Sequence, residues 1–599
     1  MSKQMLLLLG LIGVQVVANA GSAAPEKTNI IIVLADDMGY GDLSCLGNKV
    51  VKTPALDRLH DASVRFTDFH AAPMCTPSRG QLLTGMDALR NGARWVGTQE
   101  TNLRTDVPTM AELFRTRGYR TGLFGKWHLG DNYPLRPQDR GFEEAVWFPQ
   151  ASIGDKMGEY WTNSCFDDHY FHNGERRKFK GYSGDIWYDE AIPWMRQCAA
   201  DRKPFFCYLP NNLLHSPYFV PAKYREAVLK NKQLNANQAT FFGMLLNLDE
   251  NVARLDRFLA ESGLKDNTIV IFMSDNGGTQ GVPLWNAGMK GGKCTLWEGG
   301  HRVPCFIRWP AGQLGAPRDV PGLTQIQDIL PTLLDLTRGG ANPPGEPQRE
   351  ASLRLDGVSL VPALRESKPV PDRTLVVQYQ SKDVIAKDDA CVMWRQWRLI
   401  GGKELYNVET DPHQDRNVIA QNAEIAARLK AFHDTWWAGV QPDLDKRGRV
   451  VVGHDAENPL TLNASGWQGP YIVDNDAVRR GRKTNGVWNL TVAKDGRYQV
   501  ALRRWPADVD APIRAATPPV PLTDTFCYGA QTAPGVALDI AKARVKIGDF
   551  EAEKPVNDTD TEIVFELPLK AGPVTLQTWF LDGGGTLVAG AYYVRIARE

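Results

Sequence analysis

The sequence lacks net charge, because its 69 Lys and Arg residues balance its 69 Asp and Glu residues. A chain of 599 residues without a basic or acidic excess gives no sign of a nucleic-acid partner or of a polyelectrolyte role. Cysteine is also scarce: nine residues are too few for a disulfide scaffold, and their pairing is left open. Aromatic residues are plentiful, with 22 Phe, 17 Tyr and 17 Trp, which excludes disorder of the whole chain. At roughly 100–200 residues per domain, the length predicts two to four domains.

Long hydrophobic runs are nearly absent as well, and the one that exists lies at the start of the chain. Residues 5–17 (MLLLLGLIGVQVV) follow Lys3 and precede the small residues Ala18 and Ala20. This order of positive charge, apolar core and small residues predicts a secretory signal peptide over residues 1–24. A transmembrane anchor is the alternative, but a spanning helix needs about 20 apolar residues. We therefore expect an exported, periplasmic or secreted protein without stable membrane insertion.

Three short apolar runs predict buried strands of a parallel sheet. They cover residues 29–34 (NIIIVL), 205–209 (FFCYL) and 268–273 (TIVIFM), and runs of this kind are typical of strands covered on both faces. Apolar residues from 241 to 259 repeat at spacings of four and three, which predicts one face of a helix. Strand–helix alternation over this length predicts an α/β fold with a large, mostly parallel sheet between helices. Polar groups at the carboxyl ends of such strands converge on one edge, the usual place for a site.

The pattern changes near residues 443–449 (DLDKRGR). Beyond this point apolar residues alternate with period two over 498–502, 563–567 and 592–596, and turn residues separate these segments. Period-two alternation is typical of strands with one buried face, so we predict an appended β-sandwich. This appendage could bind a polymer or only buttress the rest of the chain, and the sequence leaves both roles open.

One cysteine lies in an unusual setting. Residues 71–85 read AAPMCTPSRGQLLTG, so that Pro73 and Pro77 interrupt regular structure on both sides of Cys75. A free cysteine is often a small buried hydrophobe, but an apolar helical stretch opens directly after this one. The spacing predicts that Cys75 lies just before a helix N-terminus, where backbone N–H groups favour an anion.

This stretch carries a family resemblance. Residues 75–79 (CTPSR) and 83–85 (LTG) match the pattern C-x-P-S-R-x-x-x-L-T-G, and the chain thereby resembles the type I (formylglycine-dependent) sulfatases. A second family signature is found at residues 118–128 (GYRTGLFGKWH). Further matches, which extend the resemblance over residues 28–440, are Asp36-Asp37, His215, Asp275-Asn276-Gly277-Gly278, 292–300 (GKCTLWEGG) and 404–407 (ELYN) with Asp411-Pro412. Residues 131–142 and 160–182 resemble exported bacterial sulfatases of carbohydrate degradation.

The resemblance implies a fold and a division of the chain. The fold would be the alkaline-phosphatase-like sulfatase fold, with its large sheet between helices. A catalytic α/β domain would cover residues 25–360, and a smaller C-terminal sulfatase subdomain would cover 361–442. The predicted β-sandwich would then occupy residues 443–599.

The resemblance also implies a chemistry for Cys75. A maturation enzyme of the host would oxidise this residue to formylglycine, an aldehyde whose hydrate is a geminal diol. One hydroxyl of the diol would attack sulfur, and the second would expel sulfate and regenerate the aldehyde. Cys75 is then the precursor of the nucleophile and not a thiol nucleophile. An anionic ester attacked in this way needs cations around it and a proton for its leaving group.

The other catalytic roles follow from the same resemblance. Arg79 would hold the diol, and Lys126 and Lys293 would bind sulfate oxygens. His128 would act as the base at formylglycine during sulfate release, and His215 would be the general acid toward the leaving alcohol. Taken singly, such histidines are more often structural and such lysines are more often surface charges; the family order of all of them favours the functional interpretation.

Four residues after two of the predicted strands indicate a metal site. Asp36, Asp37, Asp275 and Asn276 offer hard oxygen donors, which suit Ca²⁺ or Mg²⁺ better than zinc. The resemblance favours Ca²⁺, with Mg²⁺ as the alternative, and adds the formylglycine made from Cys75 as a further ligand. Each pair alone could equally be a turn with solvated charge.

Two positions depart from the family pattern or fall short of it. Cys294 stands beside Lys293 where many relatives carry glycine. Ser152 lies roughly where many sulfatases have a polar sulfate contact, but no motif fixes the register.

The predicted function is that of a sulfatase, a sulfuric ester hydrolase. It would hydrolyse sulfate monoesters, acting at the end of a sulfated carbohydrate. One alternative is a phosphodiester or phosphonate monoester hydrolase of the same superfamily. Another is a non-catalytic carbohydrate-binding protein on the same fold. The sequence leaves the sugar, the sulfate position, exo against endo action and the oligomeric state open.

Overall fold

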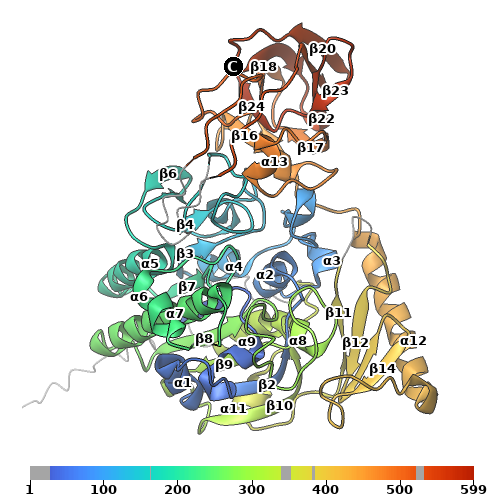
Figure 1. Cartoon of the computed structure of the whole chain (residues 1–599). Coiled ribbons are helices and arrows are strands. Elements are labelled where there is room, and N and C mark those ends of the chain that lie inside the picture. Colours follow the sequence, from blue (N-terminus) through green and yellow to red (C-terminus); the bar gives the residue numbers. More distant parts are fainter. Residues whose placement is uncertain (1–26, 162, 232, 339–352, 381–384, 521–531) are drawn as a thin grey trace, which may run out of the picture.

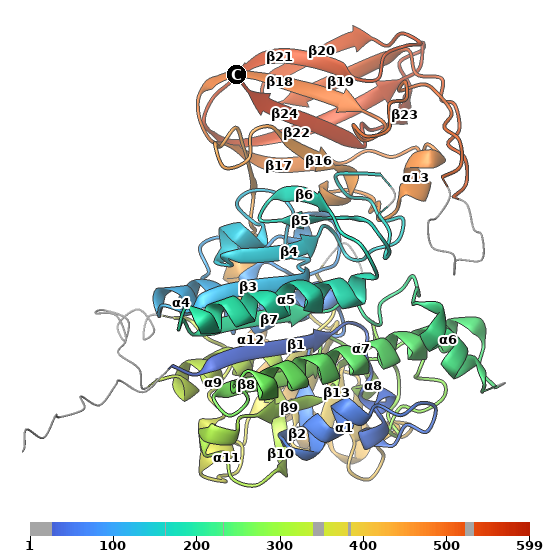
Figure 2. The same ribbon diagram turned by 90° about the vertical axis from the view of Figure 1, so that its left-hand side faces the viewer.

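The structure is a computed structural model that describes residues 27–599 apart from 162, 232, 339–352, 381–384 and 521–531. The signal peptide predicted over residues 1–24 lies outside the described residues. Within the described part, no helix combines the length and the apolar character that crossing a membrane requires. Figures 1 and 2 show three parts: an α/β body, a small sheet with a long helix at one flank, and an all-β part above.

The body is built on a ten-stranded mixed sheet with the order β10-β2-β9-β8-β1-β7-β3-β4-β5-β6. The three predicted buried strands are confirmed as β1, β7 and β8, which are buried along their whole length. From β8 through β1, β7 and β3 to β4 every neighbouring pair is parallel, whereas β9 runs antiparallel between β2 and β8. The strands are β1 Asn29–Ala35, β2 Val64–His70, β3 Arg120–Lys126, β4 Glu144–Phe148, β5 His169–His172, β6 Glu175–Lys178, β7 Phe205–Pro210, β8 Thr268–Ser274, β9 Cys305–Arg308 and β10 Arg318–Gln325.

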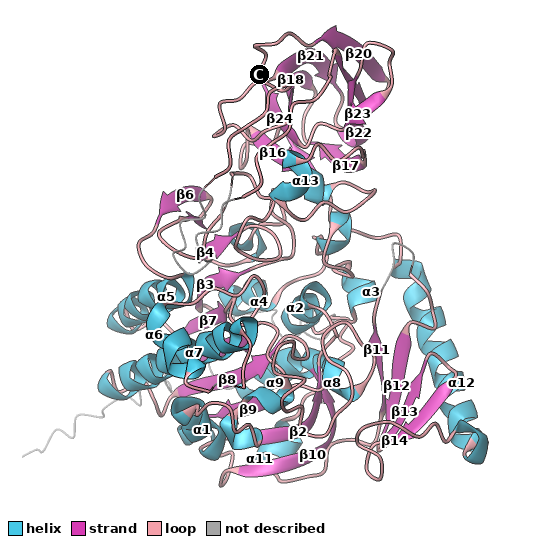
Figure 3. Cartoon of the chain, in the orientation of Figure 1, coloured by secondary structure: helices cyan, strands magenta, loops and turns pink. Residues whose placement is uncertain are grey.

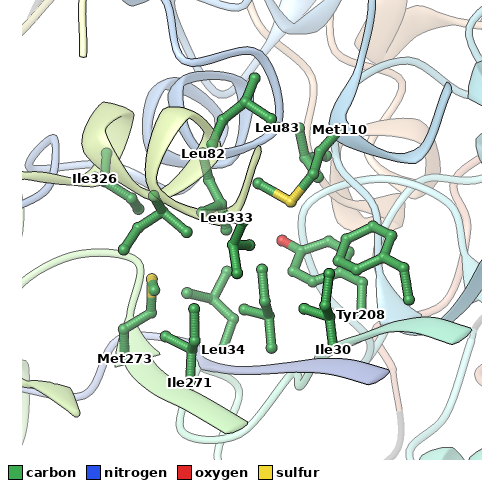
Figure 4. Close-up of a cluster of buried hydrophobic side chains, with 14 of the residues drawn as sticks. Ile30, Leu34, Leu82, Leu83, Met110, Tyr208, Ile271, Met273, Ile326 and Leu333 are labelled. Carbon is green, nitrogen blue, oxygen red and sulfur yellow. The ribbon is translucent and has the colours of Figure 1, made fainter. Parts of the chain in front are cut away.

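Helices cover both faces of this sheet, as the continuous apolar strands predict (Figure 3). One face packs on α1 Pro54–Asp61, α5 Ser183–Ala200 and α7 Ala236–Glu261. The other face packs on α2 Cys75–Thr84, α4 Met110–Thr116 and α9 Ile329–Leu336. Figure 4 shows how this second core forms, with Ile30 and Leu34 of β1 facing Leu82 and Leu83 of α2. Shorter helices of the body are α3 Ala88–Asn91, α6 Ala222–Leu229, α8 Glu298–His301 and α11 Val361–Arg365.

The second part is a four-stranded antiparallel sheet with one long helix. Its strands follow the chain in order: β11 Thr374–Gln378, β12 Ala390–Trp394, β13 Trp397–Ile400 and β14 Glu404–Asn407. Helix α12 Ala423–Val440 packs on this sheet through a small core that includes Leu429.

The third part is the predicted β-sandwich. A sheet with the path β15-β17-β22-β19-β20, to which β23 is added on β22, faces a second sheet with the order β16-β24-β18-β21 across one core. Short helix α13 Asn475–Arg479 lies at its lower end (Figure 1). The strands are β15 Val450–Val452, β16 Leu460–Asn463, β17 Val487–Val492, β18 Gly496–Arg503, β19 Lys542–Ile547, β20 Phe550–Pro555, β21 Ile563–Leu569, β22 Gly572–Leu581, β23 Leu587–Ala589 and β24 Tyr593–Arg598.

The sandwich is packed firmly onto the α/β body. Its core includes Leu135 and Met157, which belong to loops of the body. The Met157 N–H donates to Val473 O at 3.1 Å, and buried Arg479 forms an ion pair with Asp155. These contacts fix the position of the sandwich relative to the α/β body. We propose domain boundaries after residues 360 and 442.

Candidate active site

The carboxyl ends of two neighbouring strands bring the predicted metal residues together. Strands β1 and β8 pair in register from Asn29 with Thr268 to Ala35 with Ser274, so the residues that follow them leave the sheet at the same edge. Asp36 and Asp275 are completely buried there, as are their neighbours Asp37 and Asn276, at 2% exposure or less. The Asp37 N–H donates to Asp275 Oδ1 at 3.3 Å, which links the two strand ends.

Helix α2 delivers the cysteine to this edge. Cys75 is its first residue, as the sequence predicted within one position, and Gly85 ends it in the left-handed region with φ of 65°. The sulfur lies 3.7 Å from Asp36 Oδ1 and 3.5 Å from Lys293 Nζ. Burial raises the pKa of the Cys75 thiol to about 12 although the nearby lysines lower it. The unmodified thiol is therefore protonated at neutral pH, and a protonated thiol is a poor nucleophile.

Arg79 lies one turn further along α2 and is fully buried. Its guanidinium donates to Asp275 Oδ2 from Nε at 3.1 Å and from Nη2 at 2.8 Å. Nη1 donates to the backbone oxygen of Lys126 at 3.0 Å, and Nη2 lies 3.5 Å from Asp36 Oδ1. Arg79 thus connects the cysteine helix, both strand ends and the end of β3.

Two lysines flank the carboxylates from opposite sides. Lys126, the last residue of β3, donates from Nζ to Asp36 Oδ2 at 2.7 Å. Lys293, in the loop before α8, donates from Nζ to Asp37 Oδ1 at 2.6 Å. Burial would lower the pKa of Lys293, but the charges of Asp37 and Asp36 and the hydrogen bond to Asp37 raise it well above its usual value. Two ammonium groups held this close can bind the oxygens of an anion at Cys75.

The two histidines lie at the same site but in different settings. His215 Nε2 is 3.8 Å from Asp37 Oδ2, and burial, together with the charges of the two lysines, lowers the pKa of His215 to about 3 although Asp37 raises it. His128 Nε2 donates to Val96 O at 3.2 Å. Burial and the cations Lys126 and Arg79 also hold the pKa of His128 well below its usual value. Both imidazoles are therefore neutral at pH 7 before a substrate binds.

The oxygen donors at the strand ends fit a hard divalent cation. Ligand atoms of Asp36, Asp37, Cys75 and His215 all lie within 4.8 Å of one another. The Asn276 amide nitrogen donates to Asp37 Oδ1 at 3.0 Å, whereas its Oδ1 is buried with no hydrogen-bond partner in the part of the chain that the structure describes. An amide oxygen beside carboxylates is a ligand type that Ca²⁺ and Mg²⁺ prefer. The donor set thus suits the predicted metal.

A second buried cluster, which sequence reasoning missed, supports the first. Arg398, at 1% exposure, comes from β13. It donates from Nε to Glu298 Oε1 at 2.6 Å and from Nη2 to Asp68 Oδ1 at 3.1 Å. Asp68 lies on β2, seven positions before Cys75, and Glu298 begins α8, five positions after Lys293. Arg398 therefore ties the small flanking sheet to both chain segments that lead to the active site.

Two histidines complete this second cluster. His70 donates from Nε2 to Asp68 Oδ1 at 2.8 Å, and His301 donates from Nε2 to Leu296 O at 3.1 Å. Their Nδ1 atoms are 2.9 Å apart, so one ring nitrogen donates to the other. Arg398 and Arg302 balance the charges of Asp68 and Glu298. His70, Glu298 and His301 have the spacing of metal ligands, but each is already hydrogen-bonded, so the cluster is structural.

The two remaining sequence features lie apart from these contacts. Cys294 is exposed, and its sulfur lies 3.0 Å from Met74 Sδ. Ser152 is buried, and its hydroxyl has no hydrogen-bond partner among the described residues. Nothing in the structure explains why cysteine stands at position 294.

The α/β fold, with a buried cysteine, carboxylates and cationic side chains at one sheet edge, defines a class, the alkaline-phosphatase-like hydrolases. The sulfatase family model matches residues 28–340. The chain belongs to the sulfatase family and is a sulfuric ester hydrolase.

Relatives that are named as sulfatases fit this assignment. The chain is 29% identical over 442 residues to N-acetylgalactosamine-6-sulfatase of Mus musculus, covering 70% of this chain and 80% of that protein. It is 31% identical over 385 residues to arylsulfatase A of Homo sapiens, covering 59% of this chain and 71% of that protein. Among solved structures, Ps i-CgsB in complex with k-i-k-neocarrahexaose superimposes with a TM-score of 0.63 at 26% identity, covering 70% of this chain and 94% of that chain.

Proposed function

We propose that the protein removes sulfate from the end of a sulfated carbohydrate, with formylglycine at position 75 as its nucleophile. The observation that carries the proposal is the position of the Cys75 sulfur beside Asp36 and Lys293, in a buried cluster where Lys126 and Lys293 are paired with Asp36 and Asp37. The sugar sulfatase and the carrahexaose complex among its relatives support a carbohydrate substrate. Because Cys75 is 1% exposed, we infer that the maturation enzyme acts before folding is complete.

Formylglycine, once hydrated, supplies a hydroxyl that attacks sulfur and a second hydroxyl that allows sulfate to leave. The residues of this chain prepare that chemistry. Lys126 and Lys293 bind the sulfate oxygens, and Arg79 holds the diol through its fixed position on α2. A bound sulfate ester adds negative charge beside His215, which raises the pKa of this imidazole and favours the form that protonates the leaving alcohol. His128 accepts a proton at position 75 when sulfate is released.

Asp36, Asp37, Asp275, Asn276 and the modified residue 75 would hold a divalent cation, Ca²⁺ in our proposal with Mg²⁺ as the alternative. Such a cation supplies positive charge that polarises a sulfate oxygen. Burial and the charge of Asp36 together raise the pKa of Asp275 to about 6, although Arg79 lowers it. That repulsion is one a cation would relieve.

Metal removal gives the first expected result. Dialysis of the mature protein against a chelator should lower kcat/KM for an aryl sulfate about 100-fold or more, because several kcal/mol of charge stabilisation are lost. Ca²⁺ added back should restore it, and a Tm measured in parallel separates loss of metal from unfolding. Full activity in metal-free protein, verified by elemental analysis, would contradict the metal proposal.

Two alternatives from the sequence are less well supported. A phosphodiester or phosphonate monoester hydrolase would share the nucleophile, and hydrolysis of a phosphonate monoester at a higher kcat/KM than any sulfate ester would favour it. A non-catalytic carbohydrate-binding protein has no need of the buried cation and carboxylate cluster around Cys75.

The test of the nucleophile is mass spectrometry of the tryptic peptide that carries position 75, from protein made in its native host. Conversion of Cys to formylglycine lowers the peptide mass by about 18 Da relative to the thiol. Peptides carrying the other cysteines serve as internal controls and should keep their thiol mass. A purely unmodified peptide from fully active protein would overturn the mechanism.

A further inference from the structure

A cavity of about 330 Å³ opens where all three parts of the molecule meet. The α/β body contributes Trp95, Thr98 and Glu100, and the small flanking sheet contributes Gln380 just after β11. The sandwich contributes Arg447 and residues 468–470. A volume of this size lies within the range of small-molecule sites.

The wall given by the sandwich reaches the catalytic residues. Tyr471 donates from its hydroxyl to Val96 O at 3.0 Å, and His128 donates to the same carbonyl at 3.2 Å. One backbone oxygen therefore joins the sandwich to the histidine beside Lys126. Thr98, which lines the cavity, also lines a small hollow with His128.

The segment around Gly97 makes close contact with the sandwich. Gly97 packs flat against Tyr471, and a Cβ at position 97 would overlap the tyrosine ring. Gln99 and Asn489 of β17 are joined by three hydrogen bonds of 2.8–3.1 Å, and Asn489 in turn donates to Gln468 Oε1 at 2.8 Å. In Figure 1 the segment after α3 reaches up to β17 and α13 accordingly.

The chemistry of the lining points to a sugar. Trp95 lines the cavity, and its ring is supported by that of Tyr471, which follows the lining residues 468–470, at a centroid distance of 5.3 Å. An aromatic side chain with a few polar groups beside it is typical of sites that bind such ligands. Gln380 is 3% exposed, yet its Oε1 has no hydrogen-bond partner in the described part of the chain. A buried acceptor without a partner is costly unless a ligand supplies a donor such as a hydroxyl. The Arg447 side chain is fixed by an ion pair to Glu100 at 3.1 Å.

We propose that this cavity binds a sugar ring of the carbohydrate beyond the sulfated position, so that the β-sandwich helps to determine substrate specificity. The inference rests on the proposed function. It gives the sandwich a role in recognition without making it a separate binding module.

The test compares two substrates in matched variants. For the wild-type protein, kcat/KM is measured for 4-nitrophenyl sulfate and for a panel of sulfated galactosamine, glucosamine and carrageenan oligosaccharides, and the best oligosaccharide is kept. Gln380→Leu should lower the ratio of oligosaccharide to aryl kcat/KM about tenfold, since one buried hydrogen bond is lost. Gln468→Ala, on the half-buried side of the cavity, and Gly97→Ala should lower the ratio too. Gln499→Ala, on β18 and outside the lining of the cavity, is the control and should leave it unchanged.

The outcomes separate the two proposals. A ratio unchanged in folded Gln380→Leu and Gln468→Ala proteins would overturn the sugar site and leave the sulfatase chemistry intact. Hydrolysis of the aryl ester with no oligosaccharide turned over would also overturn it. Failure of mature wild-type protein to hydrolyse any sulfate ester would instead overturn the proposed function.

Discussion

Replacement of Cys75 by alanine is expected to lower kcat/KM for any sulfate ester by about 10⁴-fold or more, because alanine cannot be oxidised to the formylglycine that we propose as the nucleophile. The fold should survive. Among the residues that the structure describes, the polar contacts of the sulfur are both long, to Asp36 Oδ1 at 3.7 Å and to Lys293 Nζ at 3.5 Å. Loss of activity without loss of structure would therefore report on chemistry. Steady-state hydrolysis and far-UV circular dichroism measure the two.

The matched control is a second buried cysteine. Cys207 lies in β7, is fully buried and belongs to the core with α1, α5 and α7, on the face of the sheet opposite α2. Cys207→Ala should keep kcat/KM within about threefold while it lowers stability by about 0.5–3 kcal/mol. A Cys75→Ala protein that retains a tenth of wild-type activity would show that position 75 does not supply the nucleophile.

The sequence predicted those parts of the fold whose signals are local. The runs at β1, β7 and β8 are apolar on both faces because helices cover both sides of the sheet. The apolar residues of α7 repeat with helical spacing because one face of this helix packs on the sheet. The period-two alternation of apolar residues beyond residue 449 predicted the sandwich. The order of strands in the sheet could not be predicted from local signals. Strand β9 runs antiparallel between β2 and β8, and nothing in its four residues indicates the direction of its neighbours.

The candidate site follows the same division. Asp36 and Asp275 could be placed together because the carboxyl ends of parallel strands share an edge. Arg398 could not be placed, since 330 positions separate it from Asp68 and an arginine in a short strand looks like a surface charge. Tyr471 is 375 positions from Val96. Its only sequence signal is Gly97, a glycine whose reason is visible only in the folded chain.

Arg398→Met is expected to destabilise the protein by about 3–5 kcal/mol, because it leaves Glu298 as a buried charge without its main partner. Glu298 is 1% exposed, and its other ion pair within the described residues is with Arg302 Nη1 at 3.5 Å. Activity should fall as well, because Glu298 and Asp68 anchor the segments that carry Lys293 and Cys75, and loss of the anchor should displace these two residues. Urea denaturation and kcat/KM for an aryl sulfate measure the two effects.

Two further variants decide what causes the loss. Arg497→Met breaks an exposed ion pair with Glu566, whose side chains are 67% and 52% exposed, and should cost about 1 kcal/mol or less. Glu298→Gln added to Arg398→Met removes the unpaired buried charge and should recover part of the stability. If Arg398→Met alone stays within about 1 kcal/mol of wild type, the cluster does not hold the two segments. If stability returns in the double variant while activity does not, Arg398 positions Lys293 and Cys75 beyond keeping the chain folded.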